Sequence, residues 1–336
     1  MRLAVAVLVL LALPLAAPAM AQDYRGKQIR MVIASGAGGG YDVYARVLAR
    51  WLSRHIPGEP TLVNQNMPGA SGMNATNWAY NSAPKDGTVI LATYNADIVE
   101  PLFGNKSAKY KSRDFAWVGS IGKQQNICMT WHTSKVKTIQ DAMKSEVLVA
   151  ATGSTGNSAS LPRIVNAMLG TKFKVIGGYE TTESRLAVER GEVEGICGLS
   201  WSTLKASNPE WTQGKLMNVL LQTGSPRHPE LPDVPLLREL TKNPDDLRML
   251  DLLEIPENMG RPFVMPPGTP AALVALIRKG FDDTMKDKDF LAEAAKAHLE
   301  VDPMDGATMQ TQIERAYGAP QAMIARAASF VENPGQ

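Results

Sequence analysis

One stretch near the start of the chain, residues 27–54, constrains the fold more than any other. It begins with a short apolar run at residues 29–34, interrupted by Arg30, which predicts a buried strand. Four glycines follow, at positions 36, 38, 39 and 40. Apolar side chains then recur at three- and four-residue spacing between Tyr44 and Leu52, which predicts a helix over residues 41–55 with one buried stripe.

The loop between this strand and this helix, residues 35–42, is called the glycine corner here. The first turn of the helix leaves backbone N–H groups without intrahelical partners, at the positive end of the helix dipole. Glycine lets a ligand come close to the main chain, so a small anion can bind at such a corner. The structural alternative is a tight packing turn, in which Asp42 does no more than favour the helix N-terminus.

The first 21 residues have the form of a secretory signal peptide. Arg2 precedes an apolar run over residues 3–17, and Ala19-Met20-Ala21 matches the A-x-A cleavage pattern. We expect cleavage after Ala21, which places the mature chain outside the cytoplasm. No later apolar run approaches the roughly 18 to 20 residues that a membrane-spanning helix needs, so membrane integration is not expected.

Charge and histidine placement exclude several classes of function. Without Arg2, the chain has 34 basic and 33 acidic residues and no strong basic block, so we expect no nucleic-acid partner. The four histidines are scattered, with no spacing that forms a metal site or a base for a serine. The glycine corner also has Tyr41 where a dinucleotide fingerprint needs its third glycine. We therefore expect no cofactor and no metal.

The two cysteines, Cys128 and Cys197, lie in apolar, strand-like runs of the chain. An exported protein permits a disulfide between them, and two buried free thiols fit the same pattern. The sequence does not give the separation of the two Cα atoms, which decides whether a bridge can form. Both alternatives stay open at this point.

Strands, loops and helices alternate along the rest of the chain, which favours α/β lobes built on parallel sheets. Further strands are predicted at residues 61–63, 88–93, 127–131, 147–151, 174–176, 193–197, 216–222 and 263–265. A mature chain of about 315 residues indicates two lobes. We expect residues 22–118 and 225–336 to form the first lobe and residues 119–224 the second, with two crossover segments, one of them at residues 113–121.

Three more loops repeat the pattern of the glycine corner, because each follows a predicted strand and leads into a helix. They are residues 94–97, 152–158 and 177–182. In parallel sheets, ligands bind outside the carboxyl ends of the strands, where these loops lie. Two lobes that present such loops to a central cleft have the architecture of a hinged binding protein.

An ordered set of short motifs accompanies these loops. They are G-G-G-Y-D at residues 38–42, N-M-P-G-A-S-G at 66–72, A-P-K-D-G-T at 83–88, L-P-D-V-P at 231–235 and P-G-T-P at 267–270. Taken in this order, with the leader peptide, the set resembles the solute-binding proteins of tripartite tricarboxylate transporters, also called the Bug family. The resemblance covers nearly the whole mature chain.

The resemblance implies a monomeric periplasmic α/β protein of the Venus-flytrap kind, type II-like, that is not an enzyme. Such a protein captures a small carboxylate, such as a di- or tricarboxylate or an aromatic acid, and delivers it to membrane permease subunits. Family members hold the carboxylate through backbone groups and ordered waters. Carried over by motif, the ligand-binding residues are Ser35, Ala37, Gly38, Gly39, Gly40, Tyr41, Asp42, Asn95, Ala96, Asp97, Ser154, Thr155, Gly156, Asn157, Ser158, Gly178, Tyr179 and Glu180.

Departures from the family pattern leave the ligand's identity open. Tyr41 replaces the usual threonine, and its phenol could stack on or cap a larger ligand, while Glu180 replaces the usual basic residue. Two other classes of function share these features. One is a periplasmic sensor subunit for a signalling system. The other is a secreted hydrolase acting through Ser71 or Ser154, although residues 69–73 miss the G-x-S-x-G pattern at its last position.

Overall fold

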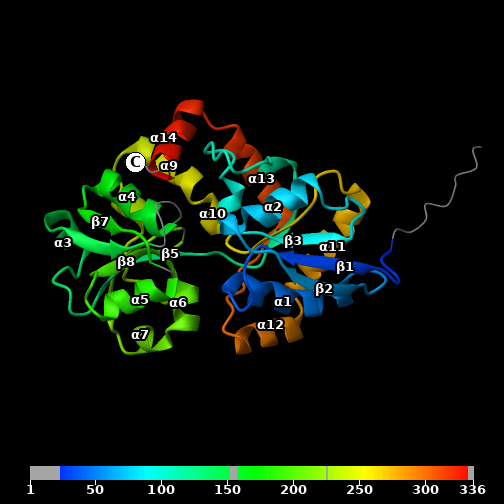
Figure 1. Ribbon diagram of the computed structural model, residues 1–336, viewed down its shortest axis with the longest axis horizontal. Helices are drawn as coiled ribbons and strands as arrows, with labels where there is room; N and C mark the ends of the chain where they lie inside the picture. The colour runs from blue at the N-terminus through cyan, green and yellow to red at the C-terminus, as the bar shows by residue number, and fades with distance from the viewer. Residues whose placement is uncertain (1–22, 152–156, 180, 225, 332–336) are drawn as a thin grey trace, which may run out of the picture.

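The structure is a computed structural model and describes residues 23–151, 157–179, 181–224 and 226–331. Two lobes lie side by side, each built on its own sheet (Figure 1). The first lobe has six strands in the order β11-β4-β10-β3-β1-β2, and the second has five in the order β7-β6-β8-β5-β9. The chain passes from one sheet to the other twice, after β4 and after β9. The predicted two-lobed α/β fold is confirmed.

The sheet of the first lobe is mixed rather than wholly parallel. Strand β1 pairs in parallel with β2 and β3, whereas β10 pairs antiparallel with β3 and β4. Its strands are β1 (Gln28–Ile33), β2 (Thr61–Asn66), β3 (Val89–Ala92), β4 (Ala116–Ser120), β10 (Pro262–Met265) and β11 (Met304–Asp305). Strand β4 corrects the expectation that residues 113–121 form a crossover segment: Trp117 and Val118 are buried in this lobe, and the crossing follows at residues 121–125.

Helices cover both faces of the first sheet, because its central strands bury side chains on both sides. Met31 and Ile33 belong to one core cluster, and the intervening Val32 belongs to the other. Figure 1 shows α1 and α12 on one side of the sheet and α2 and α13 on the other. The helices are α1 (Gly40–Leu52), α2 (Met73–Asn81), α11 (Ala271–Thr284), α12 (Lys288–Lys296) and α13 (Gly306–Tyr317), with 3-10 turns η1 (Ser53–His55), η2 (Ala70–Gly72), η3 (Asn95–Ile98) and η4 (Ser112–Asp114).

The second lobe has the same layered construction. Strand β6 pairs in parallel with β7 and β8, and β5 pairs antiparallel with β8 and β9. Its strands are β5 (Asn126–Trp131), β6 (Val147–Ala150), β7 (Phe173–Ile176), β8 (Gly195–Ser200) and β9 (Met217–Gln222). Its helices are α3 (Ile139–Lys144), α4 (Asn157–Leu169), α5 (Thr181–Glu189), α6 (Trp201–Ser207) and α7 (Pro209–Gln213).

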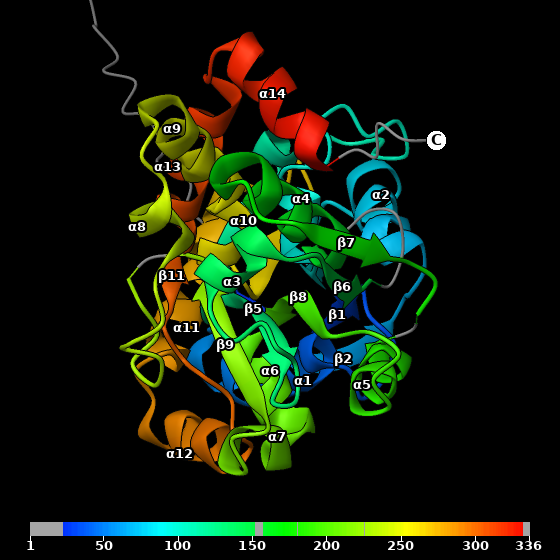
Figure 2. The same ribbon diagram turned by 90° about the vertical axis from the view of Figure 1, so that its left-hand side faces the viewer.

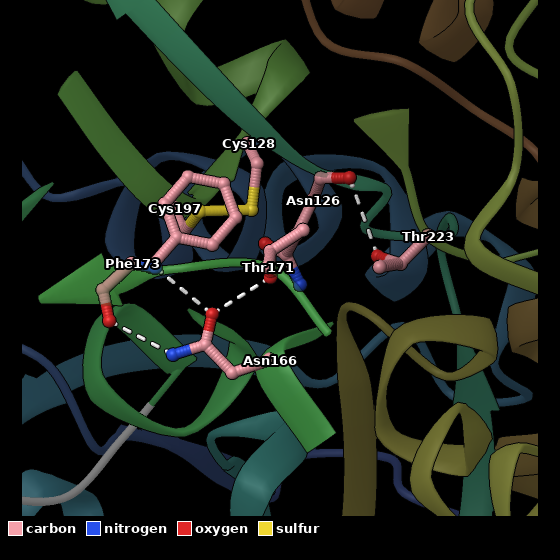
Figure 3. The surroundings of a disulfide bond; sticks show 7 residues. All are labelled: Asn126, Cys128, Asn166, Thr171, Phe173, Cys197 and Thr223. Carbon is pink, nitrogen blue, oxygen red and sulfur yellow. Dashed lines mark hydrogen bonds between the residues drawn. A yellow bond between two sulfur atoms is a disulfide. The ribbon is translucent and has the colours of Figure 1, made fainter. Parts of the chain in front are cut away.

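A disulfide joins the two cysteines inside the second lobe. Cys128 and Cys197 are register partners on β5 and β8, with Cα atoms 3.9 Å apart, and both are fully buried. Figure 3 shows the bond packed beside Phe173. Of the two alternatives that the sequence leaves open, the structure contains the bridge.

Four further helices from the last third of the chain pack against one lobe or both. They are α8 (Leu237–Leu240), α9 (Pro244–Leu253), α10 (Ile255–Asn258) and α14 (Gln321–Val331). Helix α9 buries Leu250 in the core of the second lobe and Met249 in that of the first. Helix α14 contacts α4 and α9, as Figures 1 and 2 both show at the top of the molecule. Among the described residues, no helix combines the length and apolar character needed to cross a bilayer.

Candidate functional site

A cavity of about 270 Å³ lies between the two lobes. Loops at the carboxyl ends of β1 and β3 form its first-lobe wall, and the start of α4, helix α5 and strand β8 form the opposite wall. This is the position that parallel α/β sheets offer to ligands. The lining residues are Tyr41, Tyr94, Asn95, Ala96, Gln124, Asn157, Ser158, Ser184, Arg185, Ile196, Gly198 and Leu199.

The structure brings five of the residues predicted from the sequence together around this interlobe cavity. They are Tyr41, Asn95, Ala96, Asn157 and Ser158. Two more, Gly38 and Gly40, line a neighbouring cavity of about 280 Å³. The lining of neither cavity includes Ser35, Ala37, Gly39, Asp42, Asp97, Gly178 or Tyr179. The predicted residues Ser154, Thr155, Gly156 and Glu180 lie outside the described residues.

Tyr41 is fixed in the wall of the interlobe cavity by polar contacts with two neighbours. Its Oη lies 2.9 Å from Asn95 Oδ1 and 3.3 Å from Gln124 Oε1, and it accepts a hydrogen bond from the Asn95 N–H at 3.2 Å. Its ring centroid lies 4.5 Å from that of Tyr94. Burial raises the pKa of Tyr41, so the phenol stays protonated at neutral pH. The phenol therefore acts here as part of a rigid wall.

Asp42 stabilises the glycine corner from within the protein. Its carboxylate accepts hydrogen bonds from Gly38 N, Arg46 Nε and Asn66 Nδ2, each at 2.8 Å. Burial raises the pKa of Asp42, but these hydrogen bonds outweigh it and hold the pKa below its usual range. The ionised carboxylate fixes the loop, and Gly38 takes a positive φ of 79° within it.

Asp97 points into the first lobe. It is 2% exposed, and its Oδ2 accepts hydrogen bonds from Thr76 Oγ1 at 2.5 Å and Thr93 Oγ1 at 2.6 Å. Burial raises the pKa of Asp97 to about 7. These contacts support the turn η3, which places Asn95 and Ala96 at the cavity.

The wall of the second lobe depends on a close approach between α4 and β8. Gly198 has φ of +74°, and a Cβ on it would lie 2.3 Å from the Asn157 carbonyl oxygen. Only glycine fits there, and it lets the start of α4 reach the cavity. The cation in this wall is the half-buried Arg185 of α5, whose Nη1 donates to Ser207 Oγ at 2.6 Å.

Several lining residues were not predicted from the sequence. Gln124 lies in the crossing segment. Gly198 and Leu199 belong to strand β8, whose apolar sequence predicts a buried core strand and not a binding site. Arg185 had a usable signal, because it lies near the first turn of a helix that was predicted to start at the cleft. Within the described ranges, no group of three His, Cys, Asp or Glu side chains is arranged to hold a metal ion.

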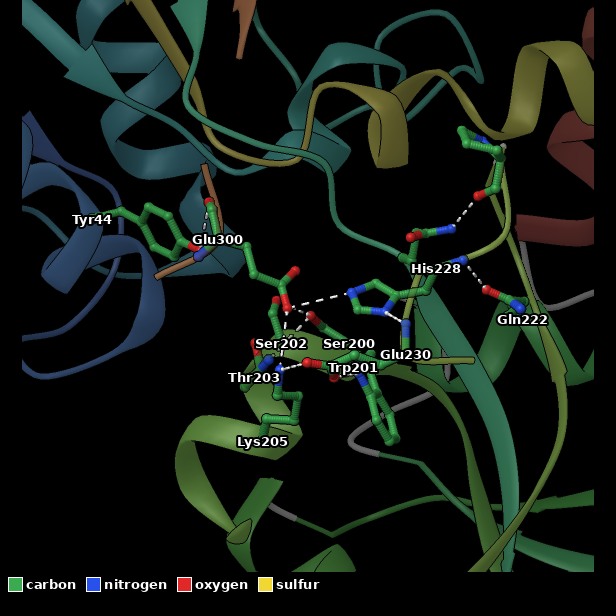
Figure 4. A network of polar contacts seen from close by, with 12 residues as sticks. Tyr44, Ser200, Trp201, Ser202, Thr203, Lys205, Gln222, His228, Glu230 and Glu300 are labelled. Atoms are coloured by element: carbon green, nitrogen blue, oxygen red, sulfur yellow. Dashed lines mark hydrogen bonds and ion pairs between the residues drawn. The ribbon is translucent and has the colours of Figure 1, made fainter. Parts of the chain in front are cut away.

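Charged side chains connect the lobes at the rim. Glu300, which follows α12, lies 3.8 Å from Lys205 Nζ and 3.4 Å from His228 Nε2. Its backbone N–H donates to Tyr44 Oη at 2.9 Å, and Lys205 pairs with Glu230 at 2.5 Å. Figure 4 shows Glu300 reaching from the Tyr44 side towards Lys205 and His228.

We expect Glu300→Gln to loosen this contact between the lobes. The side chains of Glu300 and Lys205 are about one-third exposed, so the loss is modest, on the order of 0.2–1 kcal/mol, and shifts the lobe equilibrium up to roughly fivefold towards open forms. Small-angle scattering at low salt should give a larger radius of gyration for the variant. Glu314→Gln, at an exposed residue of α13, is the matched control. Identical scattering by Glu300→Gln and wild type would contradict this role.

Comparison with known proteins identifies the family of this chain. Residues 44–327 match the family described as the tripartite tricarboxylate transporter family receptor. The chain belongs to this family. Its members are periplasmic substrate-binding proteins and are not enzymes, which decides against the hydrolase alternative.

Relatives of this tripartite tricarboxylate transporter receptor agree over most of their length. A UPF0065 protein of Cupriavidus necator is 27% identical over 307 residues, covering 88% of this chain and 86% of the relative. Protein BugT of Bordetella pertussis is 25% identical over 284 residues, covering 82% and 81%. The likeness therefore spans both lobes.

Solved structures show the same two-lobed fold. A TctC solute-binding protein from Polaromonas has a TM-score of 0.69 at 20% identity, covering 90% of this chain and 99% of that one. Rpa4515 of R. palustris with adipate has a TM-score of 0.67 at 17% identity, covering 91% and 98%. MatC of Rhodopseudomonas palustris with bound malate has a TM-score of 0.65 at 17% identity, covering 91% and 99%.

Proposed function

We propose that this receptor binds a small carboxylate in the interlobe cavity and delivers it to a permease of the tripartite tricarboxylate type. The observation that carries the proposal is a cavity lined by both lobes whose second-lobe wall contains a helix start and an arginine. The start of α4 and Arg185 form that wall, and Tyr41 and Asn95 close the cavity from the first lobe. A helix N-terminus and a guanidinium both favour a carboxylate ligand.

The size of the cavity supports a small solute. Its volume of about 270 Å³ lies just below the roughly 300–1,000 Å³ of pockets for drug-sized ligands. Two of the structural neighbours hold adipate and malate, which are dicarboxylates of this size class. We further propose export with cleavage after Ala21 and action as a monomer.

A thermal-shift screen tests the ligand class. We expect a carboxylate among malate, adipate, citrate and benzoate to raise the melting temperature, because a ligand that binds the native state alone stabilises it. The gain is about 2.7 kcal/mol at a hundredfold excess over Kd. Glucose, which is neutral, and lysine, in which two ammonium groups outweigh the single carboxylate, serve as controls of similar size. The proposal is wrong if a control shifts the melt and no carboxylate does.

Delivery to a permease needs a separate measurement, because a sensor subunit would bind the same solute. We expect the liganded protein to co-purify with membrane permease subunits from detergent extracts. Co-purification with a sensor kinase instead would assign the protein to signalling.

A further inference from the structure

The second cavity, of about 280 Å³, lies beside the interlobe cavity and is built by both lobes. Gly38, Gly40, Tyr44 and Arg261 line it on the first-lobe side, and residues of α6, among them Ser202, line it opposite. Figure 4 shows Tyr44 on α1 and Ser202 on α6 to either side of Glu300. The cavity thus opens between the glycine corner and α6.

Arg261 is held at this cavity by the first sheet. It directly precedes β10, and it is 4% exposed. Its backbone N–H donates to Ser120 Oγ at 3.1 Å, and its carbonyl accepts from the Ile121 N–H at 3.2 Å. The position of the residue is therefore set by strand pairing and not by its side chain.

The Arg261 side chain lies between two aromatic rings. Its Cζ lies 4.7 Å from the ring centroid of Tyr41 and 4.9 Å from that of Tyr44. Cation–π contacts of this kind orient a guanidinium but leave its edge N–H groups available. Nη1 donates to the Gly260 carbonyl at 3.0 Å and also to Gln124 Oε1.

The charge of Arg261 has no anionic counterpart in the part of the chain that the structure describes. No acidic side chain of those residues lies within 4.0 Å of it, and its buried Nε has no hydrogen-bond partner among them. Burying a cation without an anion is costly. A bound anion would supply the negative charge that Arg261 lacks.

The adjoining helix start contributes to the same cavity. Helix α1 has 13 residues, and no side chain caps its first turn, although Asp42 accepts from the Gly38 N–H. A Cβ on Gly40 would lie 3.9 Å from Arg261 Nη2, so the helix start lies directly beside the guanidinium. The positive end of a helix dipole and an unpaired guanidinium therefore face one space.

We propose that the Arg261 guanidinium binds a carboxylate of the solute directly in this second cavity. The inference rests on the proposed function and makes Arg261 the specificity-determining cation of the first lobe. The carboxylate is either the sole one of the solute or the second one of a dicarboxylate whose first occupies the interlobe cavity. Tyr41 and Gln124 separate the two cavities, and both contact Arg261.

Calorimetric titrations of Arg261→Gln and Arg261→Lys test this binding role. The probes are adipate, malate, hexanoate and the uncharged diamide of adipate. We expect Arg261→Gln to lose roughly 10- to 100-fold in affinity for the dicarboxylates, as for other charged hydrogen bonds. Arg261→Lys keeps the charge but not the planar fork, so its loss should be intermediate. Arg278→Gln, which removes a guanidinium bonded to the Trp117 carbonyl in the same lobe, is the matched control.

The probes distinguish the two sources of the carboxylate. A loss for adipate and malate, with hexanoate unchanged, shows that Arg261 binds the second carboxylate. Equal losses for adipate and hexanoate show that it binds the carboxylate common to both. Either result supports the proposal.

Four results overturn it. In the first, Arg261→Gln folds and binds the acids as wild type does. In the second, its loss is the same for the uncharged diamide, which assigns Arg261 to packing alone. If Arg261→Gln does not fold, Arg261→Lys and Ser202→Leu, which narrows the cavity from α6, must weaken acid binding, and unchanged affinity in both rejects the site. A wild-type protein that binds none of the acids overturns the proposed function as well, so the two failures are distinguishable.

Discussion

Loss of the Cys128–Cys197 bond is expected to lower the free energy of unfolding by about 4 kcal/mol. The bond closes a loop over a sequence separation of 69 residues, and loop-closure entropy predicts a stabilisation of this size. Its position in the middle of the second sheet, where β5 and β8 meet, also holds the register of two buried strands. Urea unfolding of wild type with and without a reductant measures the effect.

The double variant Cys128→Ala/Cys197→Ala is the control for the reductant itself. Its unfolding curve should not respond to reductant, and its stability should lie near that of the reduced wild type. A thiol titration of the denatured, unreduced protein should find no reactive thiol. Two reactive thiols, or unfolding curves that coincide in the presence and absence of reductant, would show that the bond contributes nothing in solution.

Much of the fold follows from local sequence patterns. The apolar run before the glycine corner, the four glycines and the spaced apolar residues after them predict β1 and α1 in their observed places. Strand β4 was missed because an isolated apolar run does not show which sheet it joins. The antiparallel pairing of β10 with β3 and β4 depends on residues more than 140 positions apart in the sequence. Only the folded core determines it.

The candidate site was predictable as a set of loops and not as a set of contacting side chains. Family motifs identify the segments around Tyr41, Asn95 and Asn157, all of which line the interlobe cavity. They do not show that the Asp97 carboxylate turns inward to two threonines, because Thr76 lies 21 residues away in the sequence and nothing in the pattern shows which way the Asp97 side chain points. Arg261 carries no motif at all, since Tyr41, Tyr44 and Gln124 surround it only after folding.

A cluster of three glutamates lies at the base of the cleft, where the chain crosses between the lobes. Glu100, Glu254 and Glu257 line a cavity of about 70 Å³, and burial raises the pKa of each. Arg238 pairs with Glu254 at 2.7 Å. In contrast, Glu257 accepts from two neutral donors, Thr223 Oγ1 at 2.5 Å and Asn126 Nδ2 at 2.7 Å. Asn126 begins β5 and Thr223 follows β9, so the two donors lie where the connecting segments meet the second lobe.

Glu257→Gln is therefore expected to stabilise the protein above pH 8 and to leave it unchanged near pH 4. Burial raises the pKa of Glu257 from 4.5 to about 8, so the folded state binds more protons than the unfolded state between these values. Wild-type stability then falls as pH rises through this window, whereas the glutamine, which resembles the protonated acid, adds no such slope. A pKa difference of one unit corresponds to about 1.4 kcal/mol of stability. Because Glu257 is partly exposed, we expect the full gain of Glu257→Gln above pH 8 to be about 3 kcal/mol.

Urea unfolding of wild type and Glu257→Gln at intervals from pH 4 to pH 9 gives the difference directly. The other buried carboxyls make the same contribution to the pH dependence of stability in both proteins, so their effects cancel in the comparison. Asp97→Asn is the informative control, because Asp97 is buried inside the first lobe and has a pKa of about 7. The gain in stability from this substitution should therefore be nearly complete by pH 7, below the window for Glu257. Parallel pH profiles for wild type and Glu257→Gln would show that Glu257 ionises normally. A gain above pH 8 would show that the buried charge of Glu257 opposes folding.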